Sequence, residues 1–99
     1  MAAWWLRLHG WRILGRRIRT SAGEVDIIAR RGGTVAFVEV KARGSEANLA
    51  LAIDRHRLRR VAAAAESLMP RYPAAIHRVD VMLVLPRHLP RHLPNVWHG

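Results

Sequence analysis

The stretch that decides the fold is residues 23–43, which read GEVDIIARRGGTVAFVEVKAR. Two runs rich in β-branched residues, 24–31 and 34–42, are separated by the dipeptide Gly32-Gly33. A glycine pair between two such runs is a strong hairpin signal, because glycine readily adopts the backbone conformations of tight turns. The sequence therefore predicts two antiparallel strands joined by a two-residue loop.

The predicted hairpin fixes which side chains meet across its strands. With a two-residue loop, the register places Asp26 opposite Glu39. Two positions further on, Glu24 stands opposite Lys41 on the same face. Directly opposed side chains have Cβ atoms about 4.5 to 5.5 Å apart. Two carboxylates at that separation repel each other unless a cation lies between them.

These residue types suit a hard divalent cation such as Mg²⁺ or Mn²⁺, which takes oxygen ligands and usually keeps several waters. The candidate ligands are the carboxylates of Asp26 and Glu39 and the peptide carbonyl of Val40. Lys41, the only lysine among the 17 Lys and Arg residues, lies two positions after Glu39 and therefore on the same strand face. There it can stabilise a phosphorane-like transition state or orient a metal-bound water. The pattern suits hydrolysis of a phosphodiester.

A simpler interpretation of the same residues is structural. Glu39 and Lys41 would then face solvent, Glu24 would form a cross-strand ion pair with Lys41, and Asp26 would contact an arginine. Glu-x-Lys is a short and common string, so it does not by itself decide between the two interpretations.

Outward from the hairpin, the sequence predicts one small α/β domain. The further elements are a helix over residues 2–8, a strand over 11–20, a helix that Asp54 caps and Pro70 ends, and a strand over 76–85. Residues 44–53 are interpreted as a loop. The order α-β-β-β-α-β predicts a parallel crossover between the last two strands and a mixed four-stranded sheet. The domain spans residues 1–86, and the proline-rich residues 87–99 are predicted to form an extended tail.

The chain is strongly basic, since 17 Lys and Arg against 7 Asp and Glu give a formal net charge of +10. This favours a polyanionic partner, with nucleic acid and in particular DNA as the leading candidate. An arginine-rich proteome is the alternative explanation. The candidate phosphate contacts are Arg16, Arg17, Arg19, Arg43, Arg55, Arg59 and Arg60. A solvated helix face accounts equally well for the last three. Trp4, Trp5 and Trp11 are interpreted as core residues rather than as platforms for unpaired bases.

Length and residue usage exclude several classes of protein. Ninety-nine residues provide one small core, which excludes a multidomain enzyme. Without cysteine there are no disulfides, no Cys-ligated zinc or iron–sulfur centres and no thiol nucleophile, which favours a reducing compartment. No uncharged apolar run approaches the roughly 18 residues of a membrane span, and the first residues do not form a signal peptide. We therefore expect a cytoplasmic protein without a membrane partner.

Several segments resemble the YraN family of bacterial proteins. They are GWRIL at 10–14, GEVDIIAR at 23–30, FVEVKAR at 37–43, AID at 52–54, VDV at 79–81 and LPRHLP at 89–94. That family is similar to Holliday-junction resolvases and other PD-(D/E)xK nucleases, which implies a restriction-endonuclease-like core. Under this resemblance Asp26 is the acid of the PD element, and Glu39 and Lys41 form the (D/E)xK element. Glu24 is then an accessory acid.

The resulting hypothesis is a Mg²⁺-dependent or Mn²⁺-dependent endonuclease that acts on DNA, including branched or damaged DNA. A symmetric junction cutter needs two sites, which a homodimer would supply. Related nucleases often take another acid from the first helix, but residues 1–22 contain no Asp or Glu. This departure favours the alternative of a catalytically inactive nucleic-acid-binding module with a nuclease-like fold. A small RNA-binding protein of the ribosomal kind would explain the charge but not the hairpin carboxylates.

Overall fold

The computed structural model describes residues 1–42 and 55–98. Its elements are α1 (Ala2–Leu8), β1 (Arg12–Thr20), β2 (Gly23–Arg31), β3 (Thr34–Ala42), α3 (Arg55–Leu68), the 3₁₀ turn η2 (Met69–Arg71), β4 (Ile76–Val84) and β5 (Arg91–Leu93). The expected loop at 44–53, the cap Asp54 and the candidate contact Arg43 lie outside the described residues. In the described part of the chain, no helix is long and apolar enough to cross a membrane.

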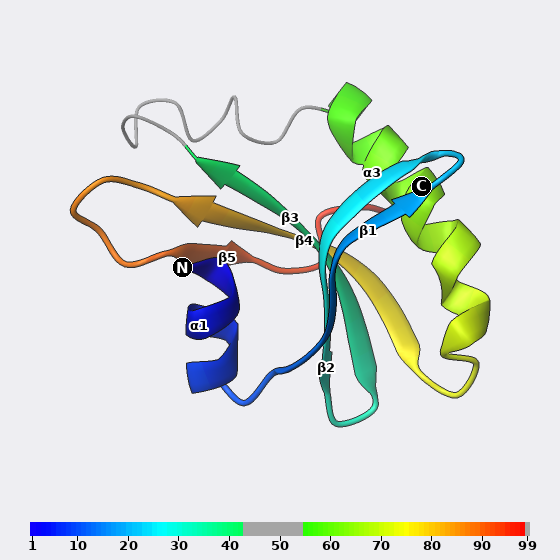
Figure 1. Ribbon diagram of the computed structural model, residues 1–99, viewed down its shortest axis with the longest axis horizontal. Coiled ribbons are helices and arrows are strands. Elements are labelled where there is room, and N and C mark those ends of the chain that lie inside the picture. The colour runs from blue at the N-terminus through cyan, green and yellow to red at the C-terminus, as the bar shows by residue number, and fades with distance from the viewer. Residues whose placement is uncertain (43–54, 99) are drawn as a thin grey trace.

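The strands form one mixed sheet in the order β1-β2-β3-β4-β5 (Figure 1). β1, β2 and β3 are antiparallel neighbours, β3 and β4 are parallel, and β5 is antiparallel to β4. The parallel pair confirms the mixed sheet expected from the helix between these strands. α3 lies against one side of the sheet in Figure 1, and its N-terminal end lies toward the C-terminal end of β3.

The β2–β3 hairpin has the predicted register. Arg31 pairs with Thr34, and the ladder continues in the same register until Ile27 pairs with Val38. The two-residue turn can form because Gly32 adopts a left-handed φ of 58°, which a residue with a Cβ adopts only with strain. The ladder ends one pair before the predicted Asp26–Glu39 pair.

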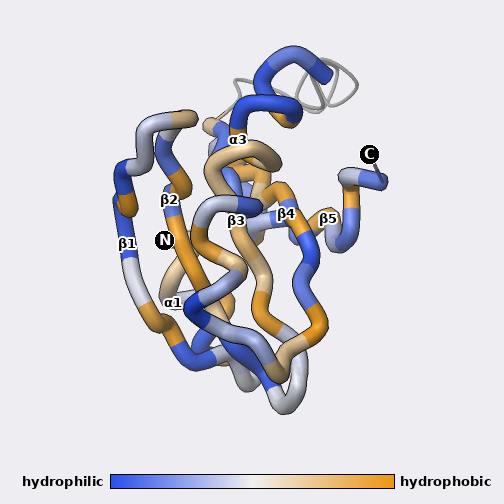
Figure 2. Tube along the Cα trace, turned by 90° about the vertical axis from the view of Figure 1, so that its right-hand side faces the viewer, coloured by the Kyte–Doolittle hydropathy of each residue, from blue (hydrophilic) through white to orange (hydrophobic). Residues whose placement is uncertain are grey.

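Each face of the sheet carries its own apolar cluster. On one face α3 buries Leu58, Val61 and Leu68 against a cluster that includes Phe37 and Val81. The buried residues of α3 recur at helical spacing, so one apolar stripe of the helix faces the sheet. In Figure 2 the apolar segments follow β2 and β3, whereas β1 is largely hydrophilic, as expected for an edge strand rich in arginine.

α1 covers the second face of the sheet. Leu6 is buried there with Trp11, Ile27, Val38 and Met82. The interpretation of the N-terminal tryptophans as core residues is right for Trp11, which is 3% exposed, whereas Trp4 is 53% exposed. A helix of seven residues buries only one of its sides, and Trp4 lies on the other.

The structure has five strands where the sequence analysis expected four. The additional strand is β5, which lies in the proline-rich stretch expected to be an extended tail. A three-residue strand between Pro90 and Pro94 is compatible with proline because it lies at the sheet edge, where prolines are tolerated. Beyond it the Val96 N–H donates to the Val79 carbonyl at 2.8 Å, and Trp97 packs against the cluster beneath α3. Residues 91–97 are therefore packed on the domain.

Candidate functional site

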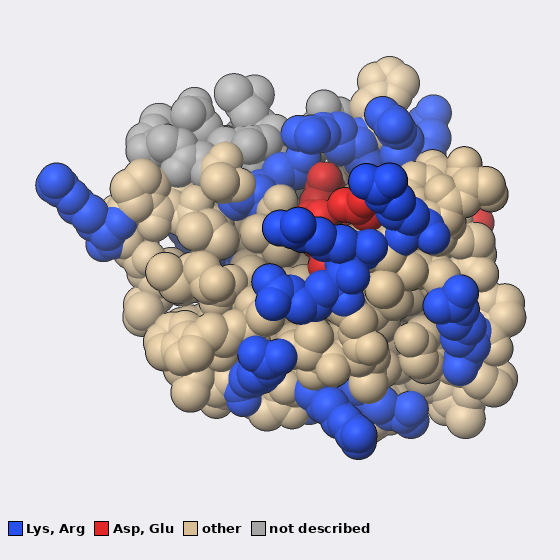
Figure 3. Space-filling model, viewed as in Figure 1, with Lys and Arg blue, Asp and Glu red and all other residues tan. Residues whose placement is uncertain are grey.

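The predicted catalytic residues line one hollow beside the end of the β2–β3 ladder. Its volume is about 410 Å³, and its lining residues are Glu24, Asp26, Glu39, Val40, Lys41, Ala42 and Arg57. Figure 3 shows acidic side chains gathered at one place on this face and surrounded by basic ones. The structure thus brings together all four predicted catalytic residues and the predicted peptide ligand.

The Asp26 side chain lies where the hydrogen-bonded ladder between β2 and β3 ends, directly after the Ile27–Val38 pair. Its Oδ2 accepts the Val40 N–H at 2.7 Å, so a side chain takes the place of the next backbone partner across the hairpin. In extended backbone the carbonyl of a residue points to the same side as its N–H, so the Val40 carbonyl also points toward β2. Asp26 and the Val40 peptide therefore lie together where β2 and β3 separate.

Glu39 and Lys41 form a buried ion pair. Lys41 Nζ lies 3.1 Å from Glu39 Oε1, and the side chains are only 3% and 13% exposed. Beyond this contact, neither Lys41 Nζ nor Glu39 Oε2 has a hydrogen-bond partner among the described residues. These residues are therefore not the solvent-facing pair of the simpler interpretation. A buried carboxylate oxygen without a partner is costly for stability, and its presence here needs an explanation.

Glu24 lies at the rim of the hollow. Its Oε2 accepts a hydrogen bond from Arg19 Nε at 3.2 Å, and both side chains are well exposed. The cross-strand ion pair between Glu24 and Lys41 in the simpler interpretation is therefore replaced by two other pairs. Arg19 is held beside the site through this carboxylate.

Arg57 is a residue of the hollow that the sequence analysis missed. It lies in the first turn of α3 and lines the main hollow together with Glu39 and Lys41. It also lines a neighbouring hollow with Arg60, whose own position was predicted to contact phosphate. The available signal was the i, i+3 spacing of Arg57 and Arg60, which puts both residues on the same helix face as Val61.

The remaining candidate phosphate contacts that the structure describes do not line the main hollow. Arg16 and Arg17 line a separate hollow that also contains Asp26. The Arg55 guanidinium lies 5.4 Å from the centre of the Trp97 ring, and Arg59 is exposed on α3. The described arginines thus reach the site from both β1 and α3.

The donor set fits a hard cation more closely than a softer one. Glu39 Oε2 is a buried carboxylate oxygen with no partner in the described part of the chain, and Asp26 and the Val40 peptide add further oxygens nearby. Within residues 1–42 and 55–98, no three His, Cys, Asp or Glu side chains form a group that could hold a metal. Mg²⁺ needs only one or two carboxylates when waters and a substrate phosphate complete its shell, so the residues fit that ion.

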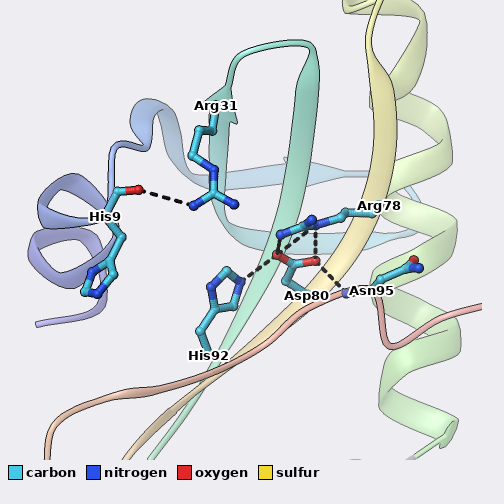
Figure 4. A network of polar contacts seen from close by, with 6 residues as sticks. All are labelled: His9, Arg31, Arg78, Asp80, His92 and Asn95. Carbon is cyan, nitrogen blue, oxygen red and sulfur yellow. Dashed lines mark hydrogen bonds and ion pairs between the residues drawn. The ribbon is translucent and has the colours of Figure 1, made fainter.

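Asp80 forms a second buried cluster that the sequence analysis did not identify. Its carboxylate is 0% exposed and accepts hydrogen bonds from Arg78 Nε at 3.0 Å and from the Asn95 N–H at 2.9 Å. His92 Nε2 lies 2.6 Å from its Oδ2 (Figure 4). Burial alone would raise the pKa of Asp80, but the bonds from His92, Asn95 and Arg78 outweigh this and hold the pKa below its ordinary value.

The Asp80 cluster is separate from the hollow. Asp80 pairs with Val38, whose side chain belongs to the cluster under α1, whereas the next residue, Val81, belongs to the cluster under α3. Glu39 pairs with Val81, so Glu39 and Asp80 lie on opposite faces of the sheet. Asp80 therefore joins β4 to the C-terminal segment and is not part of the candidate site.

Comparison with known proteins identifies the family. Residues 1–84 match the model of the uncharacterised protein family UPF0102. The chain belongs to UPF0102. A UPF0102 protein of Rhizorhabdus wittichii is 67% identical over 101 residues, which cover 100% of this chain and 86% of the relative. A UPF0102 protein of Sphingopyxis alaskensis is 66% identical and covers 97% of this chain, with 84% of that relative matched. The resemblance to the YraN family is confirmed.

Among solved structures, the UPF0102 chain is similar to Hjc, a Holliday junction resolvase from the archaeal hyperthermophile Archaeoglobus fulgidus. The TM-score is 0.53 at 21% sequence identity, and the match covers 90% of this chain and 66% of the resolvase. This likeness confirms the expected resolvase-like nuclease fold.

Proposed function

We propose that this UPF0102 protein is a metal-dependent endonuclease that hydrolyses phosphodiester bonds in DNA, branched or damaged DNA included. The observation that carries the proposal is the buried Glu39–Lys41 pair beside Asp26, whose Glu39 Oε2 and Lys41 Nζ have no further hydrogen-bond partner within residues 1–42 and 55–98. A structural ion pair is stable only when its remaining polar atoms are satisfied. Unsatisfied atoms in an acid-lined hollow are instead ready to bind a ligand.

The strand residues Asp26, Glu39, Val40, Lys41 and Glu24 have distinct roles at the hollow. Asp26, Glu39 and the Val40 carbonyl would hold Mg²⁺ or Mn²⁺, which when bound polarises the phosphoryl oxygens and lowers the pKa of water. Lys41 holds a positive charge beside Glu39, where it orients the attacking water and stabilises the charge that develops on the phosphorane. Glu24 acts at the rim as an accessory acid.

The arginines hold the substrate in position. Arg57, from the first turn of α3, lines the hollow together with the strand residues and can bind a phosphate oxygen there. With a net charge of +10, the chain attracts the DNA backbone from outside the site. We place the protein in the cytoplasm, where a homodimer would offer the two sites that a symmetric junction needs.

The test compares cutting with binding. Wild type, Asp26→Asn, Glu39→Gln and Lys41→Ala are assayed with four-way junction, duplex and single-stranded DNA, with and without Mg²⁺ or Mn²⁺. We expect the wild type to cut with metal and the three variants to lose cleavage. The two carboxylate variants should bind DNA without metal as tightly as the wild type, or more tightly, because less negative charge repels the phosphate. Glu66→Gln, which neutralises an exposed carboxylate on α3, is the matched control.

A second candidate function is a nucleic-acid-binding module without turnover. It is favoured because, among the described residues, no three His, Cys, Asp or Glu side chains are grouped so that they could hold a metal ion together. If the wild type cuts none of the three substrates in either metal yet binds them, this alternative replaces the endonuclease. Variants that cut as well as the wild type would assign the activity to other residues or to a contaminant.

A further inference from the structure

A second hollow meets the candidate active site at Asp26. Its volume is about 200 Å³, and its lining residues are Arg16, Arg17, Asp26, Ile27 and Val40. It shares Asp26 and Val40 with the hollow that holds Glu39 and Lys41. The two hollows are therefore adjacent, one mainly acidic and the other with two arginines.

The two arginines share this hollow because of an irregularity in β1. Consecutive residues of a strand normally point to opposite faces of a sheet. Arg17, however, has a left-handed φ of 52°. The β1–β2 ladder pairs Arg16 with Ile27 and Ile18 with Val25 but contains no pair for Arg17, although the register is the same on both sides of it. With this irregular backbone at Arg17, two consecutive arginines line the same hollow.

Neither guanidinium group is engaged within the described structure. Arg16 and Arg17 are both exposed, and the side chain of neither forms a hydrogen bond or ion pair with a described residue. Arg19 on the same strand differs, because it donates to Glu24 at 3.2 Å. A left-handed conformation at a residue with a Cβ costs free energy and persists mostly where function needs it. Here that conformation produces a pair of free guanidinium groups.

We propose that Arg16 and Arg17 form a clamp for the phosphodiester next to the one that lies in the acidic hollow. The position of the cleaved phosphodiester rests on the proposed function. Two guanidinium groups present planar forks of N–H donors that match phosphate oxygens. The shared Asp26 carboxylate lies between the two phosphate positions, so the clamp fixes the strand relative to the metal ligands. The contact is to the backbone and carries no sequence preference.

The test uses variants that remove the guanidinium groups without adding strain. Arg17→Gly suits the left-handed backbone because glycine adopts positive φ freely, and Arg16→Ala truncates the other side chain. Arg12→Ala is the matched control, since Arg12 is exposed on the same strand but does not line the hollow. Binding to a duplex oligonucleotide of defined length is measured without metal over a range of salt concentrations. Cleavage is then measured with Mg²⁺.

The clamp predicts that each single variant reduces the slope of log Kobs against log salt by about 0.9, and the double variant by about 1.8. The affinity should fall equally for unrelated sequences, and KM should rise more than kcat falls. A slope for the double variant equal to that of Arg12→Ala would overturn the clamp. Binding is measured without metal, so the salt dependence tests the clamp whether or not the protein cuts DNA. If the wild type cuts no DNA, that result overturns only the proposed function.

Discussion

Replacing Asp80 by Asn should destabilise the domain strongly, although Asp80 lies outside the candidate site. The carboxylate is fully buried and accepts bonds from Arg78, His92 and the Asn95 N–H. An asparagine keeps one acceptor oxygen and turns the other into a donor that faces the donors of its partners. Breaking a buried pair by removing one partner costs about 3 to 5 kcal/mol. Arg78 is 22% exposed, so water relieves part of this cost and the lower end applies, about 3 kcal/mol.

The consequence for thermal stability is large for a chain of this size. At about 4 to 8 °C per kcal/mol, the melting temperature of Asp80→Asn should fall by at least about 12 °C. Calorimetry and urea unfolding measure the change, with Glu66→Gln as the control that alters charge alone. An unfolding free energy within about 0.5 kcal/mol of wild type, the range of surface substitutions, would refute the role of Asp80 in holding the C-terminal segment.

The same cluster predicts how stability changes with pH. Because the pKa of Asp80 is lower in the folded protein than its ordinary value of 3.8, the folded state favours the ionised carboxylate. This stabilisation is fully present above pH 3.8 and is lost as the pH falls through the lower folded pKa. Below pH 4, the free energy of unfolding should therefore fall less steeply with decreasing pH in Asp80→Asn than in wild type.

Three further predictions concern the hollow and the helix beside it. The double variant Glu39→Gln/Lys41→Met replaces a buried ion pair with uncharged side chains, so its unfolding free energy should equal or exceed that of wild type while cleavage is lost. A clear loss of stability in urea titrations would show that the pair is structural. Arg57→Ala should reduce kcat by about 10²-fold if its guanidinium stabilises the transition state, whereas Arg71→Ala should not. Leu58→Ala, at a position 2% exposed on the buried side of α3, should cost about 2 to 5 kcal/mol in calorimetry.

The hairpin could be predicted from the sequence because a local signal determines it. Gly32-Gly33 sets the turn, the turn sets the register, and the register brings Asp26 and Glu39 to neighbouring positions. The early end of the ladder could not be predicted, since it depends on a side chain bonding the Val40 peptide in place of a backbone group. Periodicity describes where side chains point but not where two strands separate.

The features that the sequence did not predict, a strand and two side chains, depend on long-range contacts. β5 is short, lies between prolines and exists because β4 offers an edge with which it can pair. Asp80 gave no more signal than an isolated acid in an apolar run, because its partners His92 and Asn95 lie more than ten positions away. Arg57 required the placement of α3 over the hairpin, which no local pattern supplies.

The most direct test of the proposed site is the position of a divalent ion in a crystal soaked in Mn²⁺. We expect an anomalous difference peak in the hollow, within ligand distance of carboxylate oxygens of both Asp26 and Glu39, and no such peak in Glu39→Gln crystals soaked in parallel. A wild-type crystal with Mn²⁺ bound elsewhere, or with no peak in this hollow at a saturating concentration, would contradict the assignment of these residues as the metal centre.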